Sequence, residues 1–460
     1  MVGLYLGAVK QVEEDEGKSS SSTYPSSKWI CAVVIFACAV DAADKALLPA
    51  TFKAMEDLMQ VGPRDLGALS FAQSIAFSVA LPFWGSMMRY YRPRDLLALG
   101  CLLWGMFTLV VSTSSSFVTH FLMRLFIGAA LAVVMPIGQA MICDLVPEHE
   151  RGTAFGIMKS VCSVLAEVST FVTTALARSS LAGTSGWRVI YGVVALMSLI
   201  TAWLVKSQVP ANLSASAPVK GQTWLQEQVR VVRTAAQKPS FCFMVLQGVT
   251  GGVPWHAFAF LPFYFQQNGY SDVEAAQILL YGGFGGMMSG VLGGVLGDRF
   301  HRCWPYSGRC LAAFMSVVLG MVFFFAVMRW SESSFWFVAT IMFLFQLTGT
   351  WTQSAALRPM CGDIVQNSHD RAQILALWIA LEGIISSICG APLAGRLSEA
   401  FGYSLNAGDA LGQGQNVDAL RKALLGVSML PWAVCAIFWI PMIWSYPKDA
   451  GQSARNHFSA

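Results

Sequence analysis

The chain has 460 residues, of which 55% are hydrophobic and 12% are charged, with a mean hydropathy of +0.54. Soluble domains carry about 25% charged residues, so this composition excludes an ordinary soluble enzyme or binding domain. The net charge of +4 is too small to attract nucleic acid, and the composition predicts an integral membrane protein.

Apolar stretches of bilayer length recur along the whole chain. A transmembrane helix needs about 20 mainly apolar residues, because each adds about 1.5 Å to its length. The sequence predicts twelve such spans, at residues 29–50, 66–88, 95–113, 118–143, 153–177, 187–205, 240–265, 274–297, 309–328, 334–359, 372–397 and 421–446. We therefore expect an all-α membrane protein with twelve transmembrane helices in two six-helix halves.

The loops between the predicted spans divide the chain into segments. Residues 1–28 are polar and rich in serine, which predicts a disordered tail. The longest interior loop carries Leu225, Val229, Val232 and Ala236 at helical spacing, which is typical of an amphipathic surface helix and also of a solvated linker helix. The expected segments are a cytoplasmic tail (1–28), an N-terminal six-helix bundle (29–206), a cytoplasmic linker with a surface helix (207–239), a C-terminal six-helix bundle (240–446) and a second cytoplasmic tail (447–460).

Lysine and arginine are distributed unevenly between the two sides of the predicted spans. With the N-terminus inside, most of them fall in the tails, in the linker and in the loops on the same side, and cytoplasmic loops carry this excess in membrane proteins. We therefore expect both termini and the linker in the cytoplasm, for either a plasma or an organelle membrane. The glycosylation sequon at Asn212 must then be unmodified.

A short motif recurs at matching places in the two halves. The segment from Gly294 to Arg302 follows the eighth span, and a weaker copy begins at Gly85 after the second span. A second echo follows spans four and ten, where an Asp leaves the membrane and an Arg enters the next span. Duplicated halves are typical of transporters, which hold a substrate site between the repeats. The loop residues expected to take part in gating are Gly85, Arg89, Arg92, Asp144, Arg151, Gly294, Asp298, Arg299, Arg302, Asp363 and Arg371.

Together these motifs resemble those of the major facilitator superfamily. The second loop is similar to the family signature Gly-x-Leu-x-Asp-Arg-x-x-Arg, and Arg124 with Gly128 resembles the family's Arg-x-x-x-Gly element. The group Asp41, Asp44 and Lys45 is similar to the acidic-basic pair of organic-anion and Spinster-type (lysolipid) members. The resemblance implies a transporter in which an ion pair from the signature loop to a neighbouring helix locks one state.

The first copy of the loop departs from that signature. Arg89 and Tyr90 stand where the family has an acidic and a basic residue. Either the partner of Arg89 is acidic, or this half has lost its latch. Asp298 and Arg299 keep the family pattern and are the residues expected to gate. The alternative is that both loops only anchor the topology through positive charge.

Several ionisable residues fall inside predicted spans, where each costs about 2.5–3.5 kcal/mol on insertion scales. Asp41, Asp44 and Lys45 share one face of span one, because they are three and four residues apart. The simplest arrangement pairs Asp41 with Lys45 and leaves Asp44 to meet Arg124 of span four. We hypothesise that Asp44 is the proton-coupling acid and that Arg124 modulates it, with a purely structural ion pair as the alternative.

Four further residues are candidates for the substrate cavity. Glu167 in span five and Glu382 in span eleven approach the midplane from opposite halves. We hypothesise that one of them lines the cavity as a second proton carrier or a cation contact, with neutral acids bonded to neighbouring hydroxyls as the alternative. His256 lies in an aromatic stretch of span seven that includes Tyr264 and follows Pro254. Irregular backbone of this kind is tolerated where it lines a cavity, and a packed core histidine is the alternative.

The leading functional hypothesis is a secondary active transporter that works by alternating access, is coupled to protons, and carries a small organic anion or an amphiphilic, lysolipid-like solute. The sequence has no nucleotide-binding loop, no esterase elbow and no zinc spacing among its eleven cysteines, so we expect no enzyme activity, cofactor or metal. A non-transporting receptor or sensor on the same scaffold is the alternative. The expected partners are a small-molecule substrate, protons and the lipid bilayer, with no nucleic acid, for a monomeric protein.

Overall fold

The computed structural model describes residues 26–458, apart from 89, 148–149, 182, 212, 214–232, 234–235, 306, 358–359, 361–367 and 406–409. The predicted surface helix around Leu225 and almost all of the predicted N-terminal tail therefore lie outside the described residues. The boundaries of the two predicted bundles stay predictions.

The first half of the chain consists of helices joined by short connections. Pro63 and Pro93 stand at the first position of α5 and α6, where the missing N–H is tolerated because it has no partner within the helix. Ser180 pairs with Ser185 in a two-residue hairpin, and Gly183 supplies the positive φ of +75° that the turn requires. The elements are α3 (Ser27–Ala50), α4 (Phe52–Met59), α5 (Pro63–Met87), α6 (Pro93–Thr113), α7 (Phe117–Leu131), α8 (Val134–Leu145), α9 (Arg151–Leu176), β1 (Ser180–Leu181), β2 (Thr184–Ser185) and α10 (Gly186–Gln208).

The second half repeats this plan with several broken helices. The seventh span changes to a 3-10 turn shortly after Pro254, as the sequence predicts. Ser271 and Glu274 form a capping box that begins α14. The elements are α12 (Pro239–Ala257), η2 (Phe258–Phe260), α13 (Leu261–Gln267), α14 (Asp272–Cys303), α15 (Ser307–Arg329), α16 (Phe335–Gly349), η3 (Gln353–Leu357), α18 (Ser368–Cys389), α19 (Ala391–Ala400) and α20 (Ala410–Phe458).

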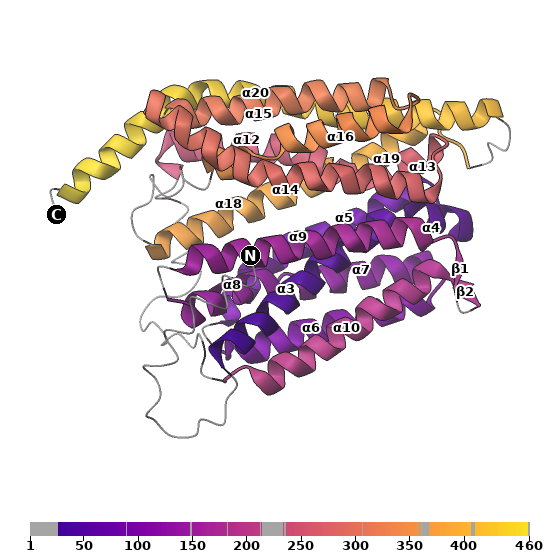
Figure 1. The fold of residues 1–460 in the computed structure, drawn as a ribbon, viewed down its shortest axis with the longest axis horizontal. Coiled ribbons are helices and arrows are strands. Elements are labelled where there is room, and N and C mark those ends of the chain that lie inside the picture. The colour runs from indigo at the N-terminus through magenta and orange to yellow at the C-terminus, as the bar shows by residue number, and fades with distance from the viewer. Residues whose placement is uncertain are drawn as a thin grey trace.

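The helices run side by side, with the first half below and the second half above in Figure 1. Between the halves, α9 packs on α14, and α5 packs on α18 and α19. We call the end where α10 ends and α12 begins the linker end, and the end that carries α4, α13 and the hairpin the far end (Figure 1). Each half therefore presents a face to the other along the length of the helices.

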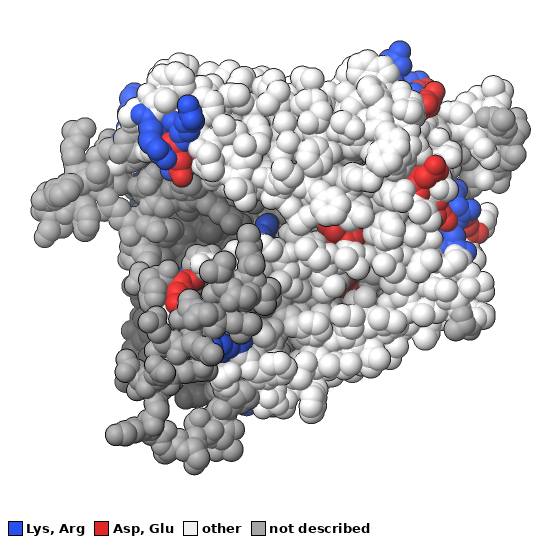
Figure 2. Space-filling model, viewed as in Figure 1, with Lys and Arg blue, Asp and Glu red and all other residues white. Residues whose placement is uncertain are grey.

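All twelve predicted spans coincide with helices or with consecutive helical segments. Among the described residues, ten helical stretches are long and apolar enough to cross a bilayer. Two predicted spans are not among them: the first, α3, which carries three ionisable residues in its second half, and the seventh, which consists of α12, η2 and α13. On the face shown in Figure 2, most of the surface is uncharged, and the charged residues gather near the two ends except for a few near the middle. This pattern fits a bilayer that surrounds the helices and leaves their ends in water.

Candidate functional site

A cavity of about 840 Å³ lies between α9 of the first half and six helices of the second half. Its volume is within the range of about 300–1,000 Å³ that is usual for small-molecule sites. The lining follows α9 from Phe155 to Glu167 and α14 from Gly283 to Val291. Since α9 begins and α14 ends at the linker end, the cavity extends from the middle of the molecule toward that end.

Both predicted carboxylates of spans five and eleven line this cavity. The carboxyl group of Glu167 lies against Gly283 of α14, where an added Cβ would come within 2.1 Å of the Glu167 Cδ. The carboxylate of Glu382 lies against Gly248 and Gly252 of α12, where added Cβ atoms would lie 3.0 and 3.1 Å from its oxygens. Within the described residues, neither carboxylate has a hydrogen-bond or ion-pair partner. The glycines make room for the acids, and the acids remain available to a ligand.

An aromatic wall lies beside these acids. The rings of Trp255 in α12 and Trp432 in α20 are 6.0 Å apart, and both line the cavity. Trp255 also stacks on Phe345, and the Trp432 indole N–H donates to the Gly251 carbonyl oxygen at 3.3 Å. Lys159 lines the cavity two turns before Glu167 on α9. Trp432 and Lys159 were not predicted, because no sequence motif sets them apart from the other aromatic and basic residues of α20 and α9.

The predicted ion pair within span one is confirmed. Lys45 Nζ lies 2.8 Å from Asp41 Oδ2, and it also lies 4.4 Å from the ring centroid of Phe77. Asp41 is buried, whereas the Lys45 side chain is 36% exposed. Spacing of four residues on one helix brings these groups together without help from the rest of the fold.

The predicted direct contact between Asp44 and Arg124 is wrong. Arg124 donates to the Gln73 Oε1 at 2.9 Å and to the Tyr191 hydroxyl. Asp44 accepts a long hydrogen bond of 3.4 Å from Thr108, and within the described structure its second oxygen has no partner. The partners of Arg124 come from α5 and α10, and the sequences of α3 and α7 alone do not indicate which side chains of other helices contact it. The side chains of Asp44 and Arg124 are both fully buried.

Two of the four cavity candidates lie elsewhere. Tyr264 is fully buried in α13, and its hydroxyl bonds to Ser331 at 2.7 Å and accepts from Arg421 at 3.1 Å. His256 is not among the described residues that line the cavity. It packs against Gly390, where an added Cβ would lie 2.3 Å from the His256 Cβ. Neither residue therefore lines this cavity: Tyr264 lies in α13, beyond the 3-10 turn, and His256 in α12 lies against Gly390.

The second signature segment is helical rather than a loop, because α14 continues to Cys303. Asp298 pairs with Arg309 of α15 at 2.9 Å, and Arg309 also donates to the Ala355 carbonyl of η3 at 3.1 Å. Arg299 and Arg302 are exposed in the last turns of α14. The Asp298 pair therefore joins three elements of the second half at the linker end.

The other predicted gating residues that the structure describes in the first half lie at its linker end. Arg151 donates to the Cys143 and Val146 carbonyls, at 3.0 and 3.3 Å, and so ties α9 to the end of α8. Gly85, Arg92 and Asp144 are exposed. Arg89 and Asp363 lie outside the described residues, and of Arg371 the structure describes only its backbone place in α18.

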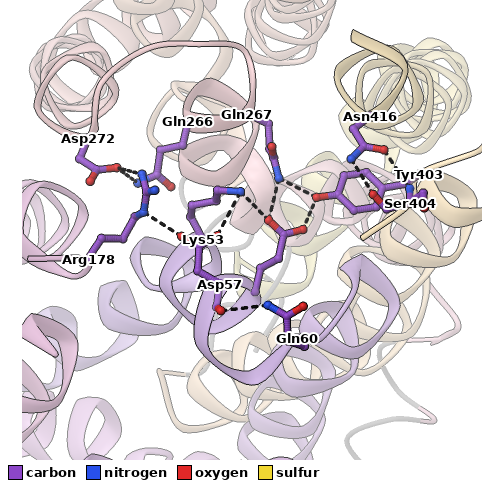
Figure 3. Close-up of polar contacts among 11 residues, drawn as sticks. Lys53, Asp57, Gln60, Arg178, Gln266, Gln267, Asp272, Tyr403, Ser404 and Asn416 are labelled. Carbon is purple, nitrogen blue, oxygen red and sulfur yellow. Dashed lines mark hydrogen bonds and ion pairs between the residues drawn. The ribbon is translucent and has the colours of Figure 1, made fainter. Parts of the chain in front are cut away.

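A polar cluster joins the two halves at the far end (Figure 3). Glu56 of α4 accepts from Lys53 and from Gln267 of α13, both at 2.7 Å, and from the hydroxyl of Tyr403. Burial and the neighbouring Glu56 carboxylate raise the pKa of the Tyr403 phenol far above its usual range. The phenol therefore stays protonated and donates.

An ion triad extends the same cluster. Arg178, which follows α9, lies 2.8 Å from Asp57 and 3.2 Å from Asp272 at the start of α14. We call this set the far-end latch. It consists of Glu56, Asp57, Arg178, Gln267, Asp272 and Tyr403. The far-end latch was not predicted from the sequence, although Lys53, Glu56 and Asp57 stand three and four residues apart directly after span one.

Known proteins share this architecture. The family model described as Major Facilitator Superfamily matches residues 34–388. A bacterial homolog of the human lysosomal transporter Spinster, solved in an inward-facing and unoccupied conformation, superposes with a TM-score of 0.76 at 16% identity over 94% of this chain and 99% of its own. A D-xylose-proton symporter superposes with a TM-score of 0.65 at 15% identity, over 88% of this chain and 96% of its own.

A curated relative gives a weaker sequence match. The probable L-galactonate transporter of Escherichia coli (strain K12) is 22% identical over 170 residues, which are 37% of this chain. The match spans about a third (36%) of that relative's length. The matched family model covers more than half of the chain and agrees with the all-α structure. The chain belongs to the Major Facilitator Superfamily.

Proposed function

We propose that the protein is a secondary active transporter that moves a small solute across a membrane by alternating access. The observation that carries this proposal is the cavity between the halves, which extends toward the linker end while the far-end latch joins the halves at the other end. A site reached from one side at a time is what alternating access requires. Uptake by purified protein in lipid vesicles, screened over solute classes with and without an imposed pH gradient, tests it.

The coupling ion in this proposal is the proton, and Asp44 is the residue that carries it. Asp44 is fully buried, holds one weak hydrogen bond from Thr108, and has no ion-pair partner in the described structure. Burial of a carboxylate favours its protonated form, whereas the charge of Arg124 favours the ionised form. A carboxylate under these opposed influences takes up and releases a proton when its hydration changes.

Replacement of Asp44 tests the coupling separately from transport. In Asp44→Asn, exchange of substrate at equal pH should persist, while uptake driven by a pH gradient should be lost. Asp418→Asn is the matched control, because Asp418 is exposed and pairs within α20 with Lys422 at 2.7 Å. Gradient-driven uptake by Asp44→Asn at the wild-type rate would remove Asp44 from this role.

Between the two substrate classes expected from the sequence, the lining supports the amphiphilic solute. Two carboxylates and two tryptophans lie around the inner part of the cavity. Lys159, a basic residue of the described lining, lies nearer the linker end. An organic anion would meet like charge there. Transport of organic acids but of no amphiphile in vesicles would reverse this assignment.

A receptor or sensor on the same scaffold is the second candidate. It is favoured by one feature, the loss of the signature residues at Arg89 and Tyr90 in the first half. In that case purified protein would bind its ligand and transport none.

The cytoplasmic placement of both termini and the monomeric state also belong to the proposal. Labelling of the exposed Cys303 from one side of intact cells tests the orientation.

A further inference from the structure

The inner part of the cavity is an acidic site. Glu167 comes from α9 and Glu382 from α18, so the two carboxylates face the space from different halves. Neither has a hydrogen-bond or ion-pair partner among the described residues. Lys159, the cation among the described lining residues, lies eight residues before Glu167 and hence about 12 Å away along the axis of α9. Glu167 and Glu382 are half-buried beside the cavity, and a nearby cation favours the ionised form of such a carboxylate. Within the described lining, a cationic ligand would supply that charge.

Glycines fix where these carboxylates lie. The Glu382 carboxylate occupies the space that side chains at Gly248 and Gly252 would take, and Glu167 does the same at Gly283. A Cβ at Gly283 would fall within 2.1–2.4 Å of the Glu167 carboxyl group and would push it out of place. The two acids thus lie in separate glycine notches beside one cavity, and the arrangement depends on α9 of the first half and on α12, α14 and α18 of the second half.

The wall beside the acids suits a cation with an apolar body. Trp255 is 37% exposed, so part of its surface is free to contact a ligand. Trp432 is held behind it by its hydrogen bond to Gly251 and by the rings of Phe258, Phe324 and Phe345. Tryptophan is the strongest cation–π partner among the side chains, and aromatic sites of this kind recognise quaternary ammonium groups.

We propose that the transported solute carries an ammonium-type cation on an apolar or aromatic body, and that Glu167, Glu382 and Trp255 bind this cation. The inference rests on the proposed transport function and names its substrate class. The two carboxylates neutralise the ammonium group, while the ring of Trp255 contacts its alkyl substituents. Solutes whose only charge is negative are rejected, because they would meet two carboxylates.

Binding of simple probes to the purified protein in lipid nanodiscs tests the proposal. Benzyltrimethylammonium is a fixed cation with an aromatic body, and phenylacetate is an anion of similar size. Calorimetry should show saturable binding of the cation and none of the anion at the same concentrations. Glu382→Gln should weaken cation binding by about tenfold or more, since removal of one member of a desolvated charge pair costs at least this much. Trp255→Leu should weaken it by about two- to thirtyfold.

Matched variants separate a site effect from misfolding. Asp418→Asn removes an exposed carboxylate on α20 and should bind benzyltrimethylammonium as the wild type does. Gly283→Ala should weaken binding, because it displaces Glu167 without removing its charge. Glu382→Gln must keep the wild-type thermal unfolding midpoint. If it unfolds early, Trp255→Leu and Gly283→Ala carry the test.

The outcomes distinguish this inference from the proposed function. Saturable phenylacetate binding, or cation binding that Glu382→Gln, Trp255→Leu and Gly283→Ala leave unchanged, overturns the inference even if vesicles transport some other solute. Cation binding that these variants weaken, in a protein that transports nothing, supports the inference as a binding site and overturns the transport function. Uptake of radiolabelled benzyltrimethylammonium into vesicles by the wild type supports both.

Discussion

Gln267 and Glu56 belong to different halves of the chain, and a hydrogen bond of 2.7 Å joins them at the far end. Tyr403, from the connection after α19, donates to the same carboxylate. Glu56 and Tyr403 are only 6% and 7% exposed. Because a bond to a buried carboxylate is costly to leave unmade, these contacts stabilise the arrangement in which the halves meet at the far end.

Removal of the Tyr403 hydroxyl should therefore favour opening of the far end. We expect Tyr403→Phe to shift the equilibrium by about 1.5–3 kcal/mol, the usual contribution of a hydrogen bond to a charged group. Distances between spin labels on α4 and α13 should show a larger separated population in the variant. Tyr446→Phe is the control, since Tyr446 is buried at the opposite end of α20. An unchanged distance distribution in Tyr403→Phe would contradict the assigned role of the far-end latch.

The pH dependence of this contact follows from the raised pKa of Tyr403. The folded protein holds the phenol proton more tightly than the unfolded chain, so the stabilisation is fully present below the ordinary tyrosine pKa of about 10. It is lost as the pH rises above that value. We expect the difference in unfolding midpoint between wild type and Tyr403→Phe to stay constant from pH 6 to 9 and to shrink above pH 10. Thermal unfolding in detergent measures it, and a difference that grows above pH 10 would reverse the assigned sign.

Arg178 should influence conformation more than stability. Its side chain is 43% exposed, so solvent screening limits its pairs with Asp57 and Asp272 to about 0.2–1 kcal/mol each. We expect Arg178→Ala to shift the unfolding midpoint little while it increases labelling of cysteines placed at the far end. Added salt should raise this labelling in the wild type toward the level of the variant. Lys422→Ala, which breaks an exposed pair within α20, should leave the labelling unchanged.

Two glycines of α14 should respond oppositely to alanine. A Cβ at Gly285 would lie 2.3 Å from the Phe343 carbonyl oxygen of α16, so Gly285→Ala forces the two helices apart and costs about 1–3 kcal/mol. Gly290 has no atom within 4 Å of its added Cβ, so Gly290→Ala should be neutral or should gain up to about 1 kcal/mol of helix propensity. Unfolding midpoints of the two variants compare these costs directly. Equal midpoints would mean that α14 and α16 do not pack closely here.

Asp298 is expected to act on the transport cycle through Arg309. Loss of the 2.9 Å ion pair in Asp298→Asn frees Arg309, which also holds the Ala355 carbonyl. We expect a severalfold lower maximal uptake rate with an unchanged substrate affinity, because the pair lies outside the cavity lining. Lys206→Ala, which breaks an ion pair with Asp95 in the first half at the same end, should have a smaller effect. Kinetics in vesicles separate the rate from the affinity, and a changed affinity alone would argue against a gating role.

The positions of the helices could be predicted from the sequence, because a helix needs only local hydrogen bonds and the length of a span follows from its apolar stretch. The sequence also determined the pair of Asp41 and Lys45, since residues four apart on one helix are neighbours whatever surrounds them. The second signature segment was recognised from its residues, although it is the end of a helix rather than a loop.

Which side chains from distant helices meet depends on how the helices pack. Arg124 bonds to Gln73 and Tyr191, from α5 and α10, rather than to Asp44. Glu56 and Tyr403 stand 347 positions apart in sequence, and their contact depends on how the two halves approach. Such contacts depend on the crossing and register of packed helices, which no single helix sequence specifies. The apolar stretches therefore predict the spans, and the packing of the two halves decides the partners of the buried charges.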